Sequence, residues 1–116
     1  MVDLNQIAVN KIYAKGVGKI TTQYCGKIFE RYMIEGNVLE LGPAEGIMTE
    51  ILYKKWKDYT VVDGAEYYIK RIKERFCDIQ TYSCMFEEFE PQNQYDNIIL
   101  GHVLEHVENP NKVIRL

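Results

Sequence analysis

Apolar positions along the chain recur with two different periods, and the period predicts which segments are helices and which are strands. Residues 4–14 and 21–36 carry apolar residues three or four positions apart, as amphipathic helices do. Gly16 and Gly18, between these segments, are expected to interrupt the helical pattern. The first part of the chain therefore predicts an N-terminal helical cap, residues 1–36.

From residue 37 onward, strand and helix patterns alternate. Short apolar runs predict strands, whereas longer stretches with an apolar stripe predict helices. The predicted strands are 37–41, 59–62, 79–82 and 96–100, and the predicted helices are 45–56, 65–76 and one that begins after a cap at Asn109. This alternation predicts a Rossmann-like α/β fold, doubly wound, with a mostly parallel sheet in the strand order 3-2-1-4.

The last predicted helix has only residues 111–116, and no strand follows it to cover the edge of the fourth strand. A bare strand edge pairs readily with other chains. We therefore expect the C-terminal strands of the fold to be missing. On this expectation, residues 37–116 are a truncated Rossmann-like domain, and either a missing C-terminal part or a second copy in a homo-oligomer covers the edge.

Composition removes several classes of function. The net charge is −3, and the basic runs 54–57 and 70–75 are interpreted as solvated helix faces, so nucleic acid is not an expected partner. No apolar run approaches the roughly 20 residues of a membrane helix. The odd, widely spaced Cys25, Cys77 and Cys84 favour reduced thiols, and hence the cytoplasm.

The segment 40–46, Glu-Leu-Gly-Pro-Ala-Glu-Gly, carries the most informative chemistry. A predicted strand here enters a tight turn of small residues, and a helix follows. Gly42 lets the backbone approach a ligand without an intervening Cβ, and the helix N-terminus offers N–H groups to polar ligand atoms. Glu40 places an acceptor near the carboxyl end of the strand, where open α/β sheets bind ligands. An ordinary strand-to-helix turn is the alternative.

A dinucleotide-binding turn would require the pattern G-x-G-x-x-G. The corresponding positions hold Gly42, Ala44 and Ile47, so two of the three glycines are absent. This departure disfavours an NAD-linked dehydrogenase.

Asp63 ends the second predicted strand, 21 residues after Gly42. A carboxylate at this place can accept hydrogen bonds from both hydroxyls of a ribose. Gly64 follows, and its lack of a side chain leaves room for an adenine ring. Alternatively, Asp63 caps the helix that begins at Ala65.

His102, Glu105 and His106 form the pattern H-x-x-E-H, which zinc proteases of the inverted type use. The pattern follows a predicted buried strand, and the chain has no other histidine to serve as a third ligand. We therefore expect no metal.

Taken together, these motifs resemble those of class I S-adenosylmethionine-dependent methyltransferases, of the small-molecule type that acts in ubiquinone and menaquinone biosynthesis. Glu40, Gly42 and Gly46 match the family's acidic-x-Gly-x-Gly-x-Gly motif, with Ala44 in place of the middle glycine. The segment 95–110, with its Leu-Glu-His-Val run and Asn-Pro pair, is similar to the fourth-strand region of the same family. The resemblance extends from residue 37 to the end of the chain.

The resemblance implies S-adenosyl-L-methionine as cofactor and S-adenosyl-L-homocysteine as product. In the family the glycine loop holds the methionine part, the acid after the second strand holds the ribose, the loop after the third strand borders adenine, and the residues after the fourth strand line the sulfonium. The corresponding residues here are Glu40, Leu41, Gly42, Pro43 and Gly46; Asp63 and Gly64; Met85 and Phe86; and Gly101 and His102.

The predicted reaction is methyl transfer to an oxygen, nitrogen or carbon nucleophile of a small-molecule acceptor. If the acceptor is a hydroxyl, His106 or His102 could act as the general base. A structural hydrogen bond to the backbone is the alternative role of His106. The alternative function is a non-catalytic module of the same fold, which binds cofactor only or serves in assembly.

Overall fold

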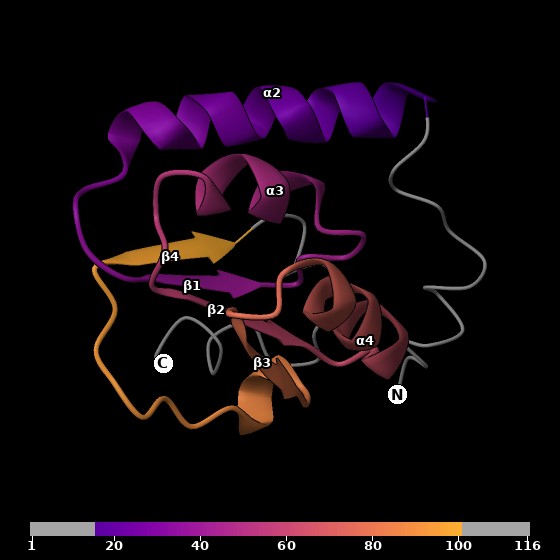
Figure 1. Ribbon diagram of the computed structural model, residues 1–116, viewed down its shortest axis with the longest axis vertical. Coiled ribbons are helices and arrows are strands. Elements are labelled where there is room, and N and C mark those ends of the chain that lie inside the picture. Colours follow the sequence, from indigo (N-terminus) through magenta and orange to yellow (C-terminus); the bar gives the residue numbers. More distant parts are fainter. Residues whose placement is uncertain (1–15, 101–116) are drawn as a thin grey trace.

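A parallel sheet of four strands forms the centre of the fold in the computed structural model, which describes residues 16–100. Its strands are β1 (Val38–Leu41), β2 (Tyr59–Asp63), β3 (Gln80–Ser83) and β4 (Asn97–Leu100). They lie in the order β3-β2-β1-β4, and all three neighbouring pairs are parallel (Figure 1). The predicted α/β fold and strand order are therefore confirmed.

One helix connects β1 to β2 and another connects β2 to β3, as crossover connections between parallel strands do. A third helix precedes the sheet. The three helices are α2 (Gly16–Tyr32), α3 (Ile47–Tyr53) and α4 (Glu66–Arg75), and a short 3-10 helix η1 (Phe86–Glu88) follows β3. The helices α3 and α4 pack on one face of the sheet, and α2 lies outside α3, whereas η1 lies on the opposite side (Figure 1).

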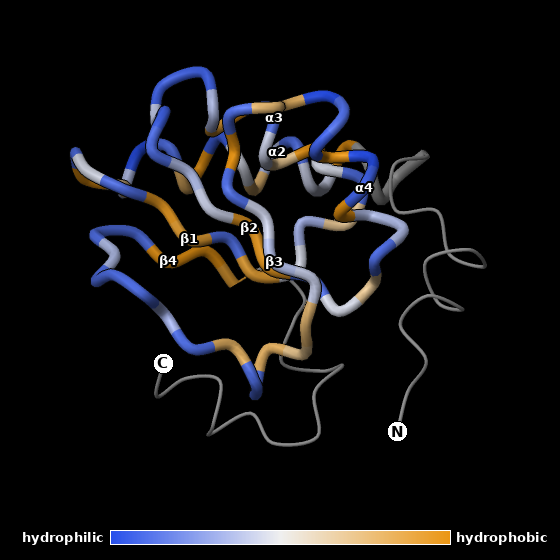
Figure 2. The backbone as a smooth tube through the Cα atoms, turned by 60° about the horizontal axis from the view of Figure 1, so that its bottom comes forward, coloured by the Kyte–Doolittle hydropathy of each residue, from blue (hydrophilic) through white to orange (hydrophobic). Residues whose placement is uncertain are grey.

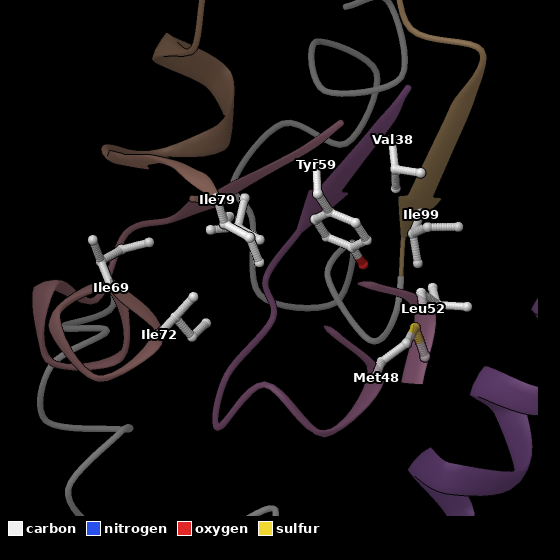
Figure 3. Close-up of a cluster of buried hydrophobic side chains, with 9 residues drawn as sticks. Val38, Met48, Leu52, Tyr59, Ile69, Ile72, Ile79 and Ile99 are labelled. Carbon is white, nitrogen blue, oxygen red and sulfur yellow. The ribbon is translucent and has the colours of Figure 1, made fainter. Parts of the chain in front are cut away.

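The alternation of side chains along β1 divides the hydrophobic core into two clusters. Val38 faces α3 and α4, and Leu39 and Leu41 face η1. The larger cluster, drawn in Figure 3, contains Val38, Met48, Leu52, Tyr59, Val61, Ile69, Ile72, Ile79 and Ile99. Figure 2 shows the same concentration of apolar residues in β1, β2 and β4. The core thus holds the strands rigidly and brings their carboxyl ends to one edge.

The boundaries of α2 and α3 differ from the prediction by more than one residue, and α2 also ends at Tyr32 rather than at residue 36. Helix α2 begins at Gly16, so Gly16 and Gly18 do not interrupt it. A helical glycine costs roughly 1 kcal/mol, and the helix packs on α3 farther along, where Gly26 lies against Ile51. Helix α3 begins at Ile47 and ends at Tyr53, and is therefore shorter than the predicted 45–56. Its late start has a local cause, because Gly46 is left-handed, with φ 81°.

The amino ends of β1 and β4 are joined by a set of polar contacts, which we call the amino-end network: Ile34, Asn37, Trp56, Asp96 and Asn97. The Asn97 side chain accepts from the Ile34 N–H (2.9 Å) and donates to the Ile34 carbonyl (2.8 Å). Asn37 and Asp96 each accept the other's backbone N–H, at 2.7 and 3.0 Å. The indole of Trp56 donates to the Ile34 carbonyl (2.8 Å). This network fixes the chain between α2 and β1.

Predictions about the edge of β4 and about the two ends of the chain lie at or beyond the limits of the described residues. Within residues 16–100, β4 pairs only with β1, and Ile98 on β4 is 50% exposed. The predicted helices 4–14 and after Asn109 lie outside the described residues. In the part of the chain that the structure describes, no helix has the length and apolar character needed to cross a bilayer.

Candidate functional site

The loop from Gly42 to Gly46, which we call the glycine loop, connects β1 to α3 through an unusual backbone path. Gly42, Ala44 and Gly46 all have positive φ, at 72°, 52° and 81°. The Gly42 N–H donates to the Val62 carbonyl (2.8 Å), and the Gly46 N–H donates to the Pro43 carbonyl (2.9 Å). These bonds fold the loop tightly against the end of β2. Left-handed backbone costs about 1–2 kcal/mol at a non-glycine residue, so Ala44 is strained.

Asp63 lies beside this loop at the last position of β2. Its Oδ1 accepts from the Ala65 N–H (2.9 Å), and its Oδ2 faces the Ala44 N–H (3.4 Å). Ala65, and not Asp63, occupies the N-cap position of α4. Asp63 nevertheless accepts an N–H at the start of α4, so its carboxylate both holds the helix start and connects it with the glycine loop.

The carboxylate of Asp63 is held in an unfavourable environment. Only 6% of the residue is exposed, and burial raises its pKa to about 6, although the N–H groups of Ala65 and Ala44 partly oppose this shift. The nearby charge of Glu45 raises the pKa further. Buried acids with perturbed pKa values are concentrated at functional sites. A ligand that donates hydroxyl groups to Asp63 would relieve this penalty.

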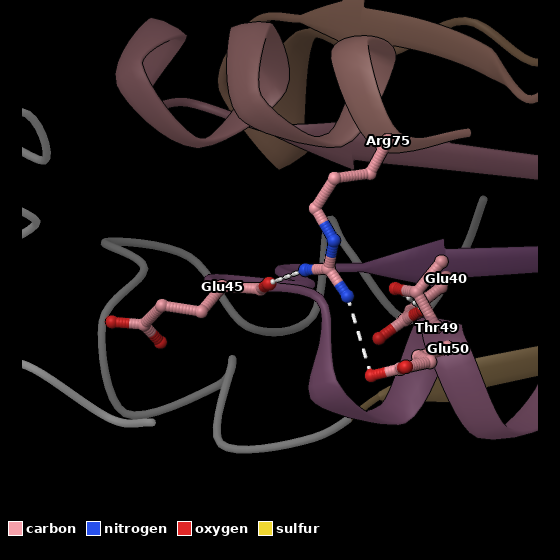
Figure 4. Close-up of polar contacts among 5 residues, drawn as sticks. All are labelled: Glu40, Glu45, Thr49, Glu50 and Arg75. Carbon is pink, nitrogen blue, oxygen red and sulfur yellow. Dashed lines mark hydrogen bonds and ion pairs between the residues drawn. The ribbon is translucent and has the colours of Figure 1, made fainter. Parts of the chain in front are cut away.

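Glu40 is also buried, with 3% exposed, but it points into the protein. Its Oε1 accepts from the hydroxyls of Thr49 (2.7 Å) and Tyr59 (2.6 Å), and the first of these bonds is drawn in Figure 4. Burial raises the pKa of Glu40, and the two hydroxyls oppose that shift. Glu40 therefore ties β1 to α3 and β2 at the base of the glycine loop. Its predicted contact with a cofactor stays a prediction.

The other predicted site residues fall into four groups. Gly42, Pro43, Gly46 and Gly64 lie at the carboxyl edge of the sheet together with Asp63. The side chains of Leu41 and Phe86 are buried in the core cluster on the η1 side, so Leu41 can meet a ligand only through its backbone. Met85 is half-buried directly before η1. Gly101, His102 and His106 lie outside the described residues.

Three residues of this region were missed by sequence reasoning: Thr49, Tyr59 and Arg75. A hydroxyl inside an otherwise apolar helix or strand was the available signal for Thr49 and Tyr59, because buried polar groups need a partner. Arg75 belongs to the basic run 70–75 that was interpreted as a solvated face. Its guanidinium in fact reaches the glycine loop, where it contacts the Glu45 carbonyl.

Metal binding finds no support in the described part. Between residues 16 and 100, no group of three His, Cys, Asp or Glu side chains could hold an ion. The H-x-x-E-H pattern lies outside that range.

Sequence comparison decides the family. The profile of the methyltransferase domain matches residues 19–116. The chain belongs to the methyltransferase domain family. No curated protein sequence matches it significantly.

Solved methyltransferases share the fold. The N-methyltransferase NodS from Bradyrhizobium japonicum WM9, in complex with S-adenosyl-l-homocysteine, superposes with a TM-score of 0.71 at 23% identity, covering 83% of this chain and 50% of NodS. The N-terminal domain of EvdMO1, also with this product bound, gives 0.70 at 15% identity, with coverage of 100% and 63%. CalS10, an amino pentose methyltransferase from Micromonospora echinaspora, gives 0.65 at 9% identity, with coverage of 97% and 48%. The chain thus spans about half the length of such methyltransferases.

Proposed function

We propose that this chain binds S-adenosyl-L-methionine at the carboxyl edge of the sheet and takes part in methyl transfer to a small-molecule acceptor. The observation that carries the proposal is the buried carboxylate of Asp63 beside the left-handed glycine loop. Family membership and the NodS and EvdMO1 structures, both of which hold the product of this cofactor, support the same conclusion.

The donor and acceptor groups of the site fit this cofactor. A ribose carries two neighbouring hydroxyls, and a carboxylate can accept from both at once. Each oxygen of Asp63 accepts only one N–H from the described residues, at 2.9 and 3.4 Å, so acceptor capacity remains. Gly42 and Gly46 present backbone without a Cβ, which allows a ligand to approach the loop closely.

When bound, the cofactor supplies an electrophilic methyl group on a sulfonium centre. The chain's own contribution is to hold that group still and to orient it. The glycine loop is fixed by its bonds to Val62 and Pro43, and Asp63 is fixed by Ala65. We further propose Gly101 and His102 near the sulfonium, Met85 near adenine, and His102 or His106 as the base for a hydroxyl acceptor.

The alternative is a module that binds the cofactor without catalysing transfer. Both functions require the same cofactor site. For either, we propose the cytoplasm as compartment, because all three cysteines are free thiols in the described part of the chain.

Isothermal titration with S-adenosyl-L-homocysteine tests the proposal, with NAD⁺ as the matched control ligand. We expect saturable binding of one equivalent of the homocysteine compound and none of NAD⁺. Circular dichroism of the same sample verifies that the protein is folded. A folded sample that binds neither ligand, or that binds NAD⁺ alone, would overturn the proposed function.

A further inference from the structure

Arg75 is the last residue of α4, yet its side chain reaches the end of the glycine loop. Nη1 donates to the Glu45 carbonyl at 2.7 Å, and Nη2 donates to Oε2 of Glu50 at 3.2 Å (Figure 4). The guanidinium also lies over the ring of Phe76, with 4.9 Å between Cζ and the ring centroid. One side chain thus connects α4, the loop and the first turn of α3.

The bond to the Glu45 carbonyl fixes a particular peptide unit. That carbonyl and the Gly46 N–H belong to the same planar group, so they rotate together. The N–H donates to the Pro43 carbonyl at 2.9 Å, while the carbonyl accepts from Arg75. A peptide held at both ends cannot flip without losing both bonds, and one of these is charge-assisted.

Close packing at Gly46 supports the same role. A Cβ placed on Gly46 would lie 3.3 Å from Cγ1 of Ile72 and 3.4 Å from Nη1 of Arg75. The loop therefore rests directly against α4 at the point where Arg75 binds it. By contrast, the ion pair with Glu50 is largely exposed, and such pairs contribute little by themselves.

We propose that Arg75 is a positioning residue, which restrains the glycine loop in its left-handed conformation and thereby sets the affinity for the cofactor. The inference about affinity rests on the proposed function. Arg75 acts through the Glu45–Gly46 peptide, and the loop backbone then meets the ligand. The expected consequence of losing Arg75 is a loop that samples other peptide orientations and binds cofactor more weakly.

Three variants separate this role from simple stabilisation: Arg75→Met, Arg75→Lys and Glu50→Gln. Arg75→Met keeps the aliphatic stem and should weaken binding of S-adenosyl-L-homocysteine about tenfold in isothermal titration. Arg75→Lys can still donate to the carbonyl and should recover part of the affinity. Glu50→Gln removes the ion pair but leaves the bond to Glu45, so its affinity should stay within about twofold. If Arg75→Met binds as the native chain does, the inference is overturned.

Amide hydrogen exchange without ligand provides a readout that does not depend on binding. The Gly46 amide should exchange faster in Arg75→Met than in the native chain, with no such change in Glu50→Gln. If the native chain does not bind S-adenosyl-L-homocysteine, the proposed function and the predicted effect of Arg75 on affinity both fail. The exchange rate of the Gly46 amide then still tests whether Arg75 restrains the glycine loop. Unchanged exchange at Gly46 would overturn the restraint. Thermal unfolding of each variant establishes that affinities are measured on folded protein.

Discussion

The two ends of the sheet are built differently, although the same strands form both. At the amino end, the network around Asn37 and Asn97 pairs side chains with backbone groups reciprocally, at 2.7–3.0 Å in its main bonds. At the carboxyl end, three of the five residues of the glycine loop are left-handed, and the buried Asp63 has a pKa near 6. The polar groups of the amino-end network thus have hydrogen-bond partners within the protein, whereas the Asp63 carboxylate at the carboxyl end can accept further hydrogen bonds.

The difference indicates where folding stability and binding are located. Satisfied polar groups and core packing stabilise the amino end, whereas backbone strain and an incompletely solvated carboxylate make the carboxyl end costly in the absence of ligand. Changes at the amino end should therefore lower the free energy of unfolding, whereas changes at the carboxyl end should relieve its cost, alter ligand affinity, or do both.

The largest expected effect is at the amino end, in Gly36→Ala. Gly36 has φ +134°, and an added Cβ would lie 1.9 Å from Oδ2 of Asp96. The substitution should lower the free energy of unfolding by about 3 kcal/mol or more in urea denaturation, because backbone and network must both shift. Its exposed neighbour is the control, since Glu35→Ala should change stability by less than about 0.5 kcal/mol. Equal stability of the two variants would contradict the importance of the network.

A smaller effect of opposite sign is expected at the carboxyl end, in Asp63→Asn. The folded-state pKa of Asp63, about 6, lies above the ordinary value of 3.8, so the folded protein holds this proton more tightly than the unfolded chain. The resulting stabilisation is present below about pH 4 and is lost as pH rises through 6. Without ligand, the variant should therefore be more stable than the native chain at pH 7.5, by about 1–3 kcal/mol.

Urea denaturation at pH 7.5 and pH 4.5 measures this difference. The advantage of Asp63→Asn should shrink at the lower pH, where the native carboxyl is largely protonated. A variant that is less stable than the native chain at both pH values would contradict the assigned cost of the buried carboxylate.

The smallest expected effect is that of Ala44→Gly. Glycine adopts the left-handed conformation at φ 52° without the strain of a Cβ, but it also gives the unfolded chain more freedom. The net stabilisation should be below about 1 kcal/mol, and affinity for S-adenosyl-L-homocysteine should change less than about twofold. Thermal unfolding and isothermal titration measure the two quantities. A clear loss of stability would show that the Ala44 methyl group packs favourably.

Most of the central sheet was predictable because β1 and β2 are buried throughout and, like β4, are rich in apolar residues, whereas the largely exposed β3 carried a weaker pattern. Val38, Val61 and Ile99 lie in apolar runs bounded by polar turn residues, so the strands, their order and the crossover helices followed from pattern alone. The position of Asp63 was also predictable. In a parallel sheet the carboxyl ends of neighbouring strands lie at the same edge, so the end of β2 lies beside the glycine loop that follows β1.

Features that depend on contacts between distant segments were not predictable. Gly16 and Gly18 were the local signal for an interruption, yet α2 begins at Gly16 and packs on α3 farther along, at Gly26. Arg75 lies in a basic run typical of a solvent-exposed face, and only the approach of α4 to the loop gives it a partner 30 positions away. The bonds of Glu40 to the hydroxyls of Thr49 and Tyr59 likewise join residues 9 and 19 positions apart, and nothing in the local pattern indicated them.

The most direct test of the central claim compares ligand affinity in Asp63→Ala and Asn97→Ala. Isothermal titration with S-adenosyl-L-homocysteine at pH 7.5, at a temperature where both variants are folded, should show more than about tenfold weaker binding for Asp63→Ala, because it loses the acceptor for the ribose hydroxyls. Asn97→Ala should bind as the native chain does, although it loses about 2 kcal/mol of stability with its bonds to Ile34. Unchanged affinity in Asp63→Ala, or equal weakening in both variants, would contradict the division between a stabilising end and a binding end of the sheet.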